Sequence, residues 1–217
     1  MFDPRSEEPI KGRERWIALG LFALIAGAFA ADFATRFEPA KLSIPFMLLA
    51  WAPLLVLHEA AHAWVARRVG WRIHGIVIGF GRPVASRTLA GVPVEIRMLP
   101  LEGFVLCSPR ELEGVRWKSV AIYAAGPGIE LLLALAMLAA LGPELLARSE
   151  SVGVIALQSV ALASVLGGIL NLMPHSTVGP GGELPSDGFG IWLSLTRPLE
   201  DWKAELRRRR FFGPDDA

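Results

Sequence analysis

Apolar stretches alternate with polar segments along the chain, and four of the stretches are long enough to cross a bilayer. A membrane-spanning helix needs about 20 mainly apolar residues. The four stretches cover residues 16–33, 42–64, 120–141 and 152–173. This pattern predicts a mostly α-helical, polytopic membrane protein with about four transmembrane helices.

The first stretch has two interpretations. Basic residues precede it, and Ala28-Phe29-Ala30 resembles the small-residue cleavage site of a signal peptide. We expect a retained membrane anchor, with a cleaved signal peptide as the alternative. The topology of the later spans is the same in both cases.

Residues 71–118 break the apolar pattern. Short β-prone runs at 73–80, 84–88, 92–98 and 104–107 are separated by Gly and Pro. They predict a small β-hairpin or meander inserted between two spans. Such an insertion is either a structural connector or an edge that pairs with an extended peptide.

Three segments follow from this pattern. Residues 1–41 form an N-terminal tail and the first span, and residues 42–195 form a membrane core. Within the core, a glycine-rich loop at 175–185 precedes a short amphipathic helix at 189–195. Residues 196–217 form a basic tail whose Arg207-Arg208-Arg209-Arg210 run is typical of a solvated flank that touches anionic lipid.

Composition and charge agree with a membrane protein. The chain is 53% hydrophobic and 20% charged, with a mean hydropathy of +0.43, which fits membrane spans joined by polar loops. A net charge of +1 gives no reason to expect a nucleic acid partner, and one cysteine excludes an intrachain disulfide. Most of the 22 Lys and Arg residues lie in the N-terminal tail, the 65–118 region and the C-terminal tail. The positive-inside rule therefore places both termini and the β-rich insertion in the cytosol.

The second span contains an H-E-x-x-H pattern formed by His58, Glu59 and His62. Positions i and i+4 share one face of a helix, so the two imidazoles can bind one cation, and such pairs suit Zn²⁺. Glu59 can act as a general base on a water beside that cation. Ionisable groups at membrane depth are functional candidates. The alternative is a chance match, or a buried His pair satisfied by hydrogen bonds.

A catalytic zinc site needs a third protein ligand and an open position. Asp187 is favoured because Gly188 lets the backbone turn tightly beside a metal, and because Asp187 lies at the same cytosolic end as His62. His175 is its nearest rival, and Glu183 is a further candidate. Glu130, the acidic residue of the third span, either contributes to the site or makes a structural hydrogen bond.

These features together resemble the site-2 protease family of intramembrane zinc metalloproteases. The resemblance covers about residues 42–195, with its motifs in the family's order. They are HEAAH at 58–62, Gly79-Phe80-Gly81, the 99–105 segment, Gly126-Pro127, and Asn171-x-x-Pro174 followed by Asp187-Gly188. Two departures are Glu130, where the family usually has Asn, and a long gap between Pro174 and Asp187.

The resemblance implies an activity and a set of roles. One Zn²⁺ per chain would be held by His58, His62 and Asp187, with Glu59 as the catalytic glutamate. Asn171 would be a polar group near the substrate carbonyl, and the strands around Gly79 would hold an unwound substrate. The activity implied is hydrolysis of peptide bonds in single-span, membrane-anchored proteins, within or near the bilayer of a prokaryotic cell membrane.

Two other classes of function are open from the sequence. A non-proteolytic membrane scaffold or regulator would keep a structural zinc site, but it would have no need of Glu59. A zinc transporter would need several intramembrane acids or histidines along a path. Only Glu130 accompanies the motif within the spans, apart from Asp32 at the end of the first stretch. The substrate and the activating signal are not specified, and an oligomer is possible but unspecified.

Overall fold

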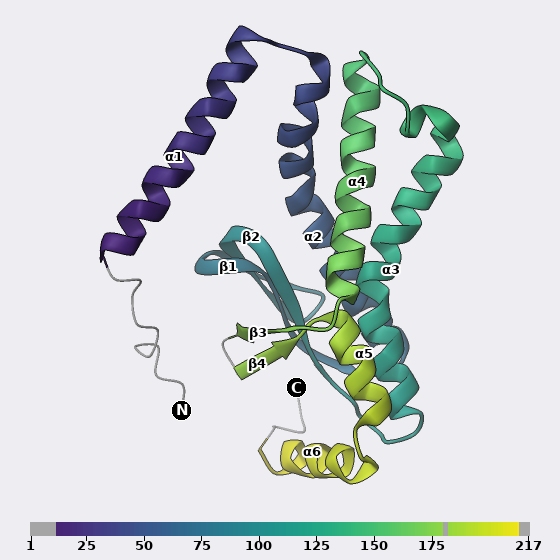
Figure 1. Cartoon of the computed structure of the whole chain (residues 1–217). Helices are drawn as coiled ribbons and strands as arrows, with labels where there is room; N and C mark the ends of the chain where they lie inside the picture. The colour runs from purple at the N-terminus through teal and green to yellow at the C-terminus, as the bar shows by residue number, and fades with distance from the viewer. Residues whose placement is uncertain (1–11, 180–181, 213–217) are drawn as a thin grey trace.

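The structure is a computed structural model of the chain and describes residues 12–179 and 182–212 (Figure 1). Helices dominate, and two hairpins interrupt them. In chain order the elements are α1 (Gly12–Thr35), η1 (Pro39–Leu42), α2 (Ser43–Arg68), β1 (Arg72–Leu89), β2 (Val92–Ser108), α3 (Val115–Leu141), η2 (Gly142–Leu145), α4 (Val152–Leu172), β3 (Ser176–Gly179), β4 (Gly182–Pro185), α5 (Asp187–Thr196) and α6 (Leu199–Phe212).

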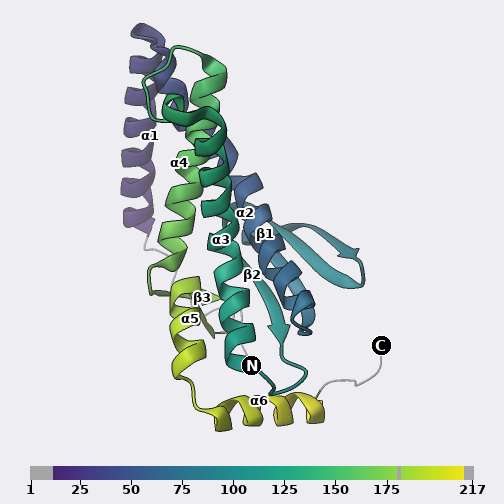
Figure 2. The same cartoon turned by 90° about the vertical axis from the view of Figure 1, so that its right-hand side faces the viewer.

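Three helical stretches are long and apolar enough to cross a membrane. They are Pro39–Arg68, Val115–Leu145 and Val152–Leu172, and their helices α2, α3 and α4 pack side by side (Figures 1 and 2). The chain is therefore a multi-pass membrane protein. The predicted first span corresponds to α1, whose apolar part within the described residues is the shorter Ala23–Thr35. The three spans identified are thus fewer than the four predicted.

Helix α2 has an apolar outer face and a polar inner face. Exposed Leu48, Leu49 and Trp64 lie on the outside, where lipid can cover them. The inner face buries the motif residues together with Leu54 and three alanines, namely Ala50, Leu54, His58, Glu59, His62, Ala63 and Ala66. This is the reverse of a water-soluble helix, and it is how a membrane helix carries ionisable groups without exposing them to hydrocarbon.

The β-rich insertion forms one long, bent antiparallel hairpin of β1 and β2. All four predicted β-prone runs lie within these two strands. The predicted break at Ala90-Gly91 is the turn between β1 and β2, but the other predicted breaks do not end a strand. Instead the register shifts between Ile78 and Ala85, where Gly79 and Gly81 have positive φ values of 96° and 87°. Because glycine adopts these angles readily, the pairing continues through the irregularity. Ile76 lies opposite both Val105 and Val94, so segments of β2 flank β1 on two sides.

The segment after α4 is more ordered than the sequence predicted. The 175–185 loop contains the β3–β4 hairpin, in which Ser176 pairs with Pro185. Helix α5 begins at Asp187 rather than at Phe189, because the Ser186 hydroxyl accepts a hydrogen bond from the Phe189 N–H and caps the helix. A Ser119–Ser194 hydrogen bond of 2.7 Å then joins α5 to α3.

The C-terminal helix α6 lies across the end of the helix bundle (Figure 2). Trp202 is buried there and meets the ring of Trp71, with ring centroids 6.2 Å apart. The basic tail is thus anchored by an aromatic contact at its start. The side chains of Arg208, Arg209 and Arg210 lie outside the described part of the structure.

Candidate metal centre

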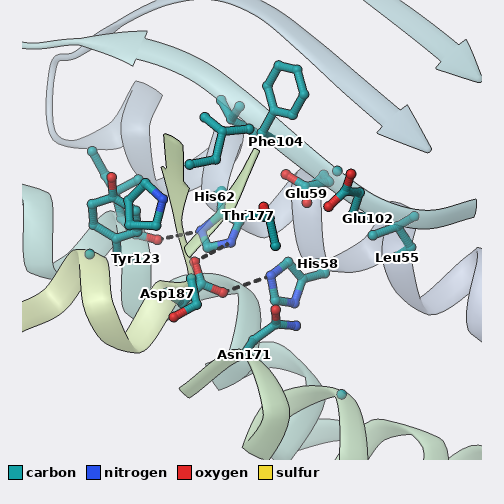
Figure 3. A pocket seen from close by; sticks show the side chains of 18 of the residues that line it. Leu55, His58, Glu59, His62, Glu102, Phe104, Tyr123, Asn171, Thr177 and Asp187 are labelled. Atoms are coloured by element: carbon teal, nitrogen blue, oxygen red, sulfur yellow. Dashed lines mark hydrogen bonds and ion pairs between the residues drawn. The ribbon is translucent and has the colours of Figure 1, made fainter. Parts of the chain in front are cut away.

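Three buried side chains from two distant elements meet beside α3. His58 and His62 project from the inner face of α2, and Asp187 is the first residue of α5. The Nε2 atom of His58 lies 3.0 Å from Oδ2 of Asp187, and Nε2 of His62 lies 3.2 Å from Oδ1 (Figure 3). One ligand atom from each residue lies within 4.8 Å of the other two. The group can therefore hold a metal ion.

The outer nitrogens of the two imidazoles have their own partners. Nδ1 of His62 lies 2.6 Å from the main-chain carbonyl of Ile122, which can only accept a hydrogen bond. Nδ1 of His58 lies 3.3 Å from Oε2 of Glu130. The Ile122 carbonyl assigns the proton of a neutral His62 ring to Nδ1. The Glu130 carboxylate lies near Nδ1 of His58 without hydrogen-bond geometry, and its charge favours the same tautomer there, so that both Nε2 lone pairs face Asp187.

This arrangement fits a cation at the centre. Two nitrogen lone pairs and a carboxylate repel one another unless a positive charge lies between them, either a metal ion or protons on the rings. Ligands about 2.0–2.1 Å from a tetrahedral Zn²⁺ lie about 3.3 Å from each other. The 3.0 and 3.2 Å nitrogen–oxygen distances end on different oxygens of Asp187 and are of this order. Two imidazoles and a carboxylate are also a donor set that Zn²⁺ accepts.

Asp187 is held in its ionised form. Burial alone would raise its pKa, but when the rings of His58 and His62 are protonated, their hydrogen bonds and charge outweigh burial and lower the pKa below its ordinary value. A carboxylate must be deprotonated to bind a metal. The surroundings therefore favour the ligand form of this side chain.

Two glycines allow the elements to approach this closely. A Cβ atom on Gly126 of α3 would lie 2.3 Å from Nε2 of His62 and 2.4 Å from Nε2 of His58. A Cβ atom on Gly188 would lie 1.9 Å from the main-chain oxygen of Leu172. Gly188 is helical rather than part of a tight turn, so its role differs from the one predicted. It lets the start of α5 approach the end of α4.

Glu59 lies in the same cavity and approaches the hairpin. Its side chain is buried, and a Cβ atom on Gly103 of β2 would lie 2.8 Å from its Cγ and Oε1 atoms. The cavity has a volume of about 790 Å³ and extends from Leu55 of α2 to Ser194 of α5. It is large enough for water and for a length of extended peptide next to Glu59.

Asn171 also lines this cavity, from the last turn of α4, and Figure 3 shows it near His58. Glu102, Tyr123 and Thr177 line it too, although the sequence analysis did not single them out. Tyr123 is the chain's one tyrosine and lies in a predicted span, so the sequence could have indicated it as a candidate site residue. The sequence could not have indicated the Ile122 carbonyl, because every residue carries that group.

The rival ligands occupy other positions. His175 is exposed, and its Nδ1 atom lies 2.8 Å from the Met173 carbonyl. Glu130 reaches the outer nitrogen of His58, on the side away from Asp187. The side chain of Glu183 lies outside the described part of the structure. Asp187 is thus the candidate that lies beside the His pair, and its role as a zinc ligand stays a prediction.

Comparison with known proteins finds similarity over the part of the chain that carries His58, Glu59 and His62. Residues 46–149 match peptidase family M50. The chain is 32% identical over 101 residues to the zinc metalloprotease Rip1 of Mycobacterium tuberculosis, covering 40% of this chain and 25% of that one. It is 35% identical over 102 residues to the regulator of sigma-E protease RseP of Escherichia coli, covering 41% of this chain and 23% of that one.

The segment that matches this family carries the H-E-x-x-H motif, β1, β2 and the Gly-Pro step of α3. The predicted resemblance to the site-2 protease family is confirmed. The names of these bacterial relatives imply Zn²⁺ as the metal. The matched stretch spans about a quarter of the length of these curated relatives.

Proposed function

We propose that the protein is an intramembrane zinc metalloprotease that hydrolyses peptide bonds of membrane-anchored proteins within or near the bilayer. The observation that carries the proposal is the meeting of His58, His62 and Asp187 on the buried side of a membrane helix. The zinc metalloprotease and protease names of its relatives support it.

Each remaining side chain then has a role. A bound Zn²⁺ would polarise the scissile carbonyl and lower the pKa of a water. Glu59 would take a proton from the attacking water and give it to the leaving amine. Asn171 would donate a hydrogen bond to the carbonyl oxygen as negative charge develops there.

The hairpin offers a place for the substrate. Residues 103–106 of β2 pair with β1 on one side only within the described residues, and Gly103 lies beside Glu59. A helical substrate hides its carbonyl groups behind hydrogen bonds, whereas a strand added to an open edge presents them. We therefore place a locally unwound, single-span substrate along this edge, with its scissile bond near Glu59.

The topology belongs to the same proposal. We take α1 as a fourth span, because its described apolar side chains Ile17, Leu21, Leu24 and Ile25 are exposed. Together with the distribution of Lys and Arg, this supports a topology with both termini and the hairpin in the cytosol. The functional units are then residues 1–41, the core at 42–195 and the basic tail at 196–217.

The number of ligands favours an enzyme over a scaffold with a structural zinc. A structural zinc is closed by four protein ligands, whereas a catalytic zinc has three and an open position. The metal-binding group found among the described residues has three members. Glu59, which a scaffold would not need, lies in the cavity beside them.

The Glu59→Gln variant tests the proposal. The purified protein would be reconstituted in liposomes with a fluorescently labelled single-span peptide whose helix is weakened by glycines near its cytosolic end. We expect wild-type protein to cleave the peptide, and Glu59→Gln to lose cleavage at least a hundredfold, in line with the contribution of general acid–base catalysis, while its zinc content stays near one per chain. Glu111→Gln, which removes an exposed surface partner of Lys118, serves as the matched control and should cleave normally. Unimpaired cleavage by Glu59→Gln would exclude Glu59 as the base.

A further inference from the structure

We propose that Glu130 is a positioning residue that holds His58 by its outer nitrogen and strengthens its binding of zinc. This inference rests on the proposed zinc site but not on the proposed peptidase activity. No role for Glu130 follows from the H-E-x-x-H motif, because it lies on a different helix. What identifies it is the 3.3 Å approach of its Oε2 atom to Nδ1 of His58.

Three helices enclose the carboxylate of Glu130. The residue lies in α3 with only 4% of its surface exposed, and it faces His58 of α2. On the α4 side, a Cβ atom on Gly167 would lie 3.0 Å from its Oε1 atom and 3.1 Å from Oε2. Any larger residue at position 167 would crowd the carboxylate, so the glycine makes room for it.

A buried carboxylate at membrane depth is costly. Helix packing alone does not require one, since an apolar side chain of similar size would fill the same space. Within the part of the chain that the structure describes, His58 is the one ion partner of Glu130. The contact with His58 is therefore the interaction that can offset the cost of burying the acid.

The chemistry of a histidine ligand explains what this contact does. A carboxylate that accepts the Nδ1 proton fixes the tautomer and the ring orientation, and it makes the opposite nitrogen a stronger donor to a metal. His62 has a neutral main-chain carbonyl in the equivalent place, 2.6 Å away. The two histidines are thus supported unequally, with a charged partner for His58 and a neutral one for His62.

The test compares Glu130→Gln and Glu130→Leu with wild-type protein in detergent. Gln keeps an oxygen acceptor but removes the charge, and Leu removes both. Ser159→Ala is the control, because Ser159 is also buried in a span, bonds its own helix at the Ile155 carbonyl and does not line the cavity. Zinc affinity would be measured by competition with a chelator, and the absorption spectrum of the Co²⁺-loaded protein would report the ligand field.

We expect zinc affinity to fall about 10–100-fold in Glu130→Leu, the range seen when support of a histidine ligand is lost, and to fall less in Glu130→Gln. The Co²⁺ spectrum should shift in both variants and stay unchanged in Ser159→Ala. If Glu130→Leu does not fold, the zinc affinity and the Co²⁺ spectrum of Glu130→Gln test the inference by themselves.

Two outcomes contradict the inference in distinguishable ways. Wild-type affinity and an unchanged Co²⁺ spectrum in Glu130→Gln, with a lowered melting temperature of the metal-free protein, would make Glu130 a packing residue and leave the zinc site intact. Failure of the wild-type protein itself to bind Zn²⁺ or Co²⁺ would overturn the proposed zinc site and the inference together.

Discussion

At the scale of single residues, the candidate metal centre depends on which nitrogen of each imidazole faces Asp187. Both imidazoles turn Nε2 towards Asp187, because Ile122 and Glu130 occupy their Nδ1 sides. The motif predicts that two histidines share a face of the helix, but it does not predict which nitrogen is free. That choice is made by α3, a helix that begins more than fifty residues later.

Replacing Asp187 and His175 one at a time tests which of the two is the third zinc ligand. Asp187→Ala should bind zinc at least tenfold more weakly than wild-type protein, because it leaves two ligands where a stable site has three or more. His175→Ala should bind zinc normally, since His175 is exposed and contacts the Met173 carbonyl. Chelator competition on the two variants measures both affinities. The reverse order of affinities would assign the third ligand to His175.

The sequence predicts the residues of the candidate site more readily than the contacts that surround them. His58, Glu59 and His62 were found because their spacing on a helix is fixed by local geometry. Asp187 was singled out among several candidates from its place in the predicted topology. The contact between Glu59 and Gly103 had no local signal, because it depends on how far the hairpin reaches back towards α2.

At the scale of elements, close packing of α3 on α2 brings the site together. Gly126 faces both histidines at a distance that leaves no room for a side chain. The adjacent Pro127 is fully buried and α3 continues through it. In membranes, small residues are what allow helices to approach this closely.

Adding one methyl group to α3 should therefore be enough to disable the site. Gly126→Ala places a Cβ atom 2.3–2.4 Å from both Nε2 atoms, so we expect zinc content well below half of the wild-type value. Gly128→Ala is the matched control, because nothing lies within 4 Å of its added Cβ. Gly128→Ala should keep zinc, and its free energy of unfolding should equal that of the wild-type protein or exceed it by up to about 1 kcal/mol. Equal zinc contents in the two alanine variants would show that α3 does not pack this closely.

The β1–β2 hairpin was predicted only in part from the sequence. Each β-prone run was located correctly, since side-chain composition decides strand propensity locally. Their joining into two long strands was missed, because Gly79 and Gly81 indicate a turn in the sequence but act as irregularities inside β1. The β3–β4 hairpin was missed for a related reason, because its short strands are mostly small and polar residues.

At the scale of the whole molecule, the proposed topology places the centre towards the cytosolic ends of the spans. The motif lies in the second half of α2, and Asp187 follows the end of α4. The three spans of the described structure agree with the apolar pattern of the sequence. The predicted first span is not among them, because the apolar part of α1 within the described residues is only Ala23–Thr35. The N-terminal end of α1 also stands apart from the bundle (Figure 1).

Cysteine labelling tests this topology. In a Cys107→Ser background, single cysteines at Glu150→Cys, Thr196→Cys and Ser6→Cys would be treated in intact cells with a membrane-impermeant maleimide. We expect Glu150→Cys to react at once, and the other two to react only after permeabilisation. Reaction of Ser6→Cys in intact cells would show that α1 does not cross the membrane. Reaction of Thr196→Cys in intact cells would show that the core has the opposite orientation in the membrane.

The order in which the chain is made has a consequence for the centre. His58 and Asp187 are 129 residues apart, so a ribosome must translate well past the last span before the third ligand can emerge and fold back. A partly synthesised chain would carry the histidines and Glu59 without the group that completes them. The proposed peptidase would therefore be inactive towards neighbouring nascent proteins until Asp187 has been synthesised and has folded back onto α2.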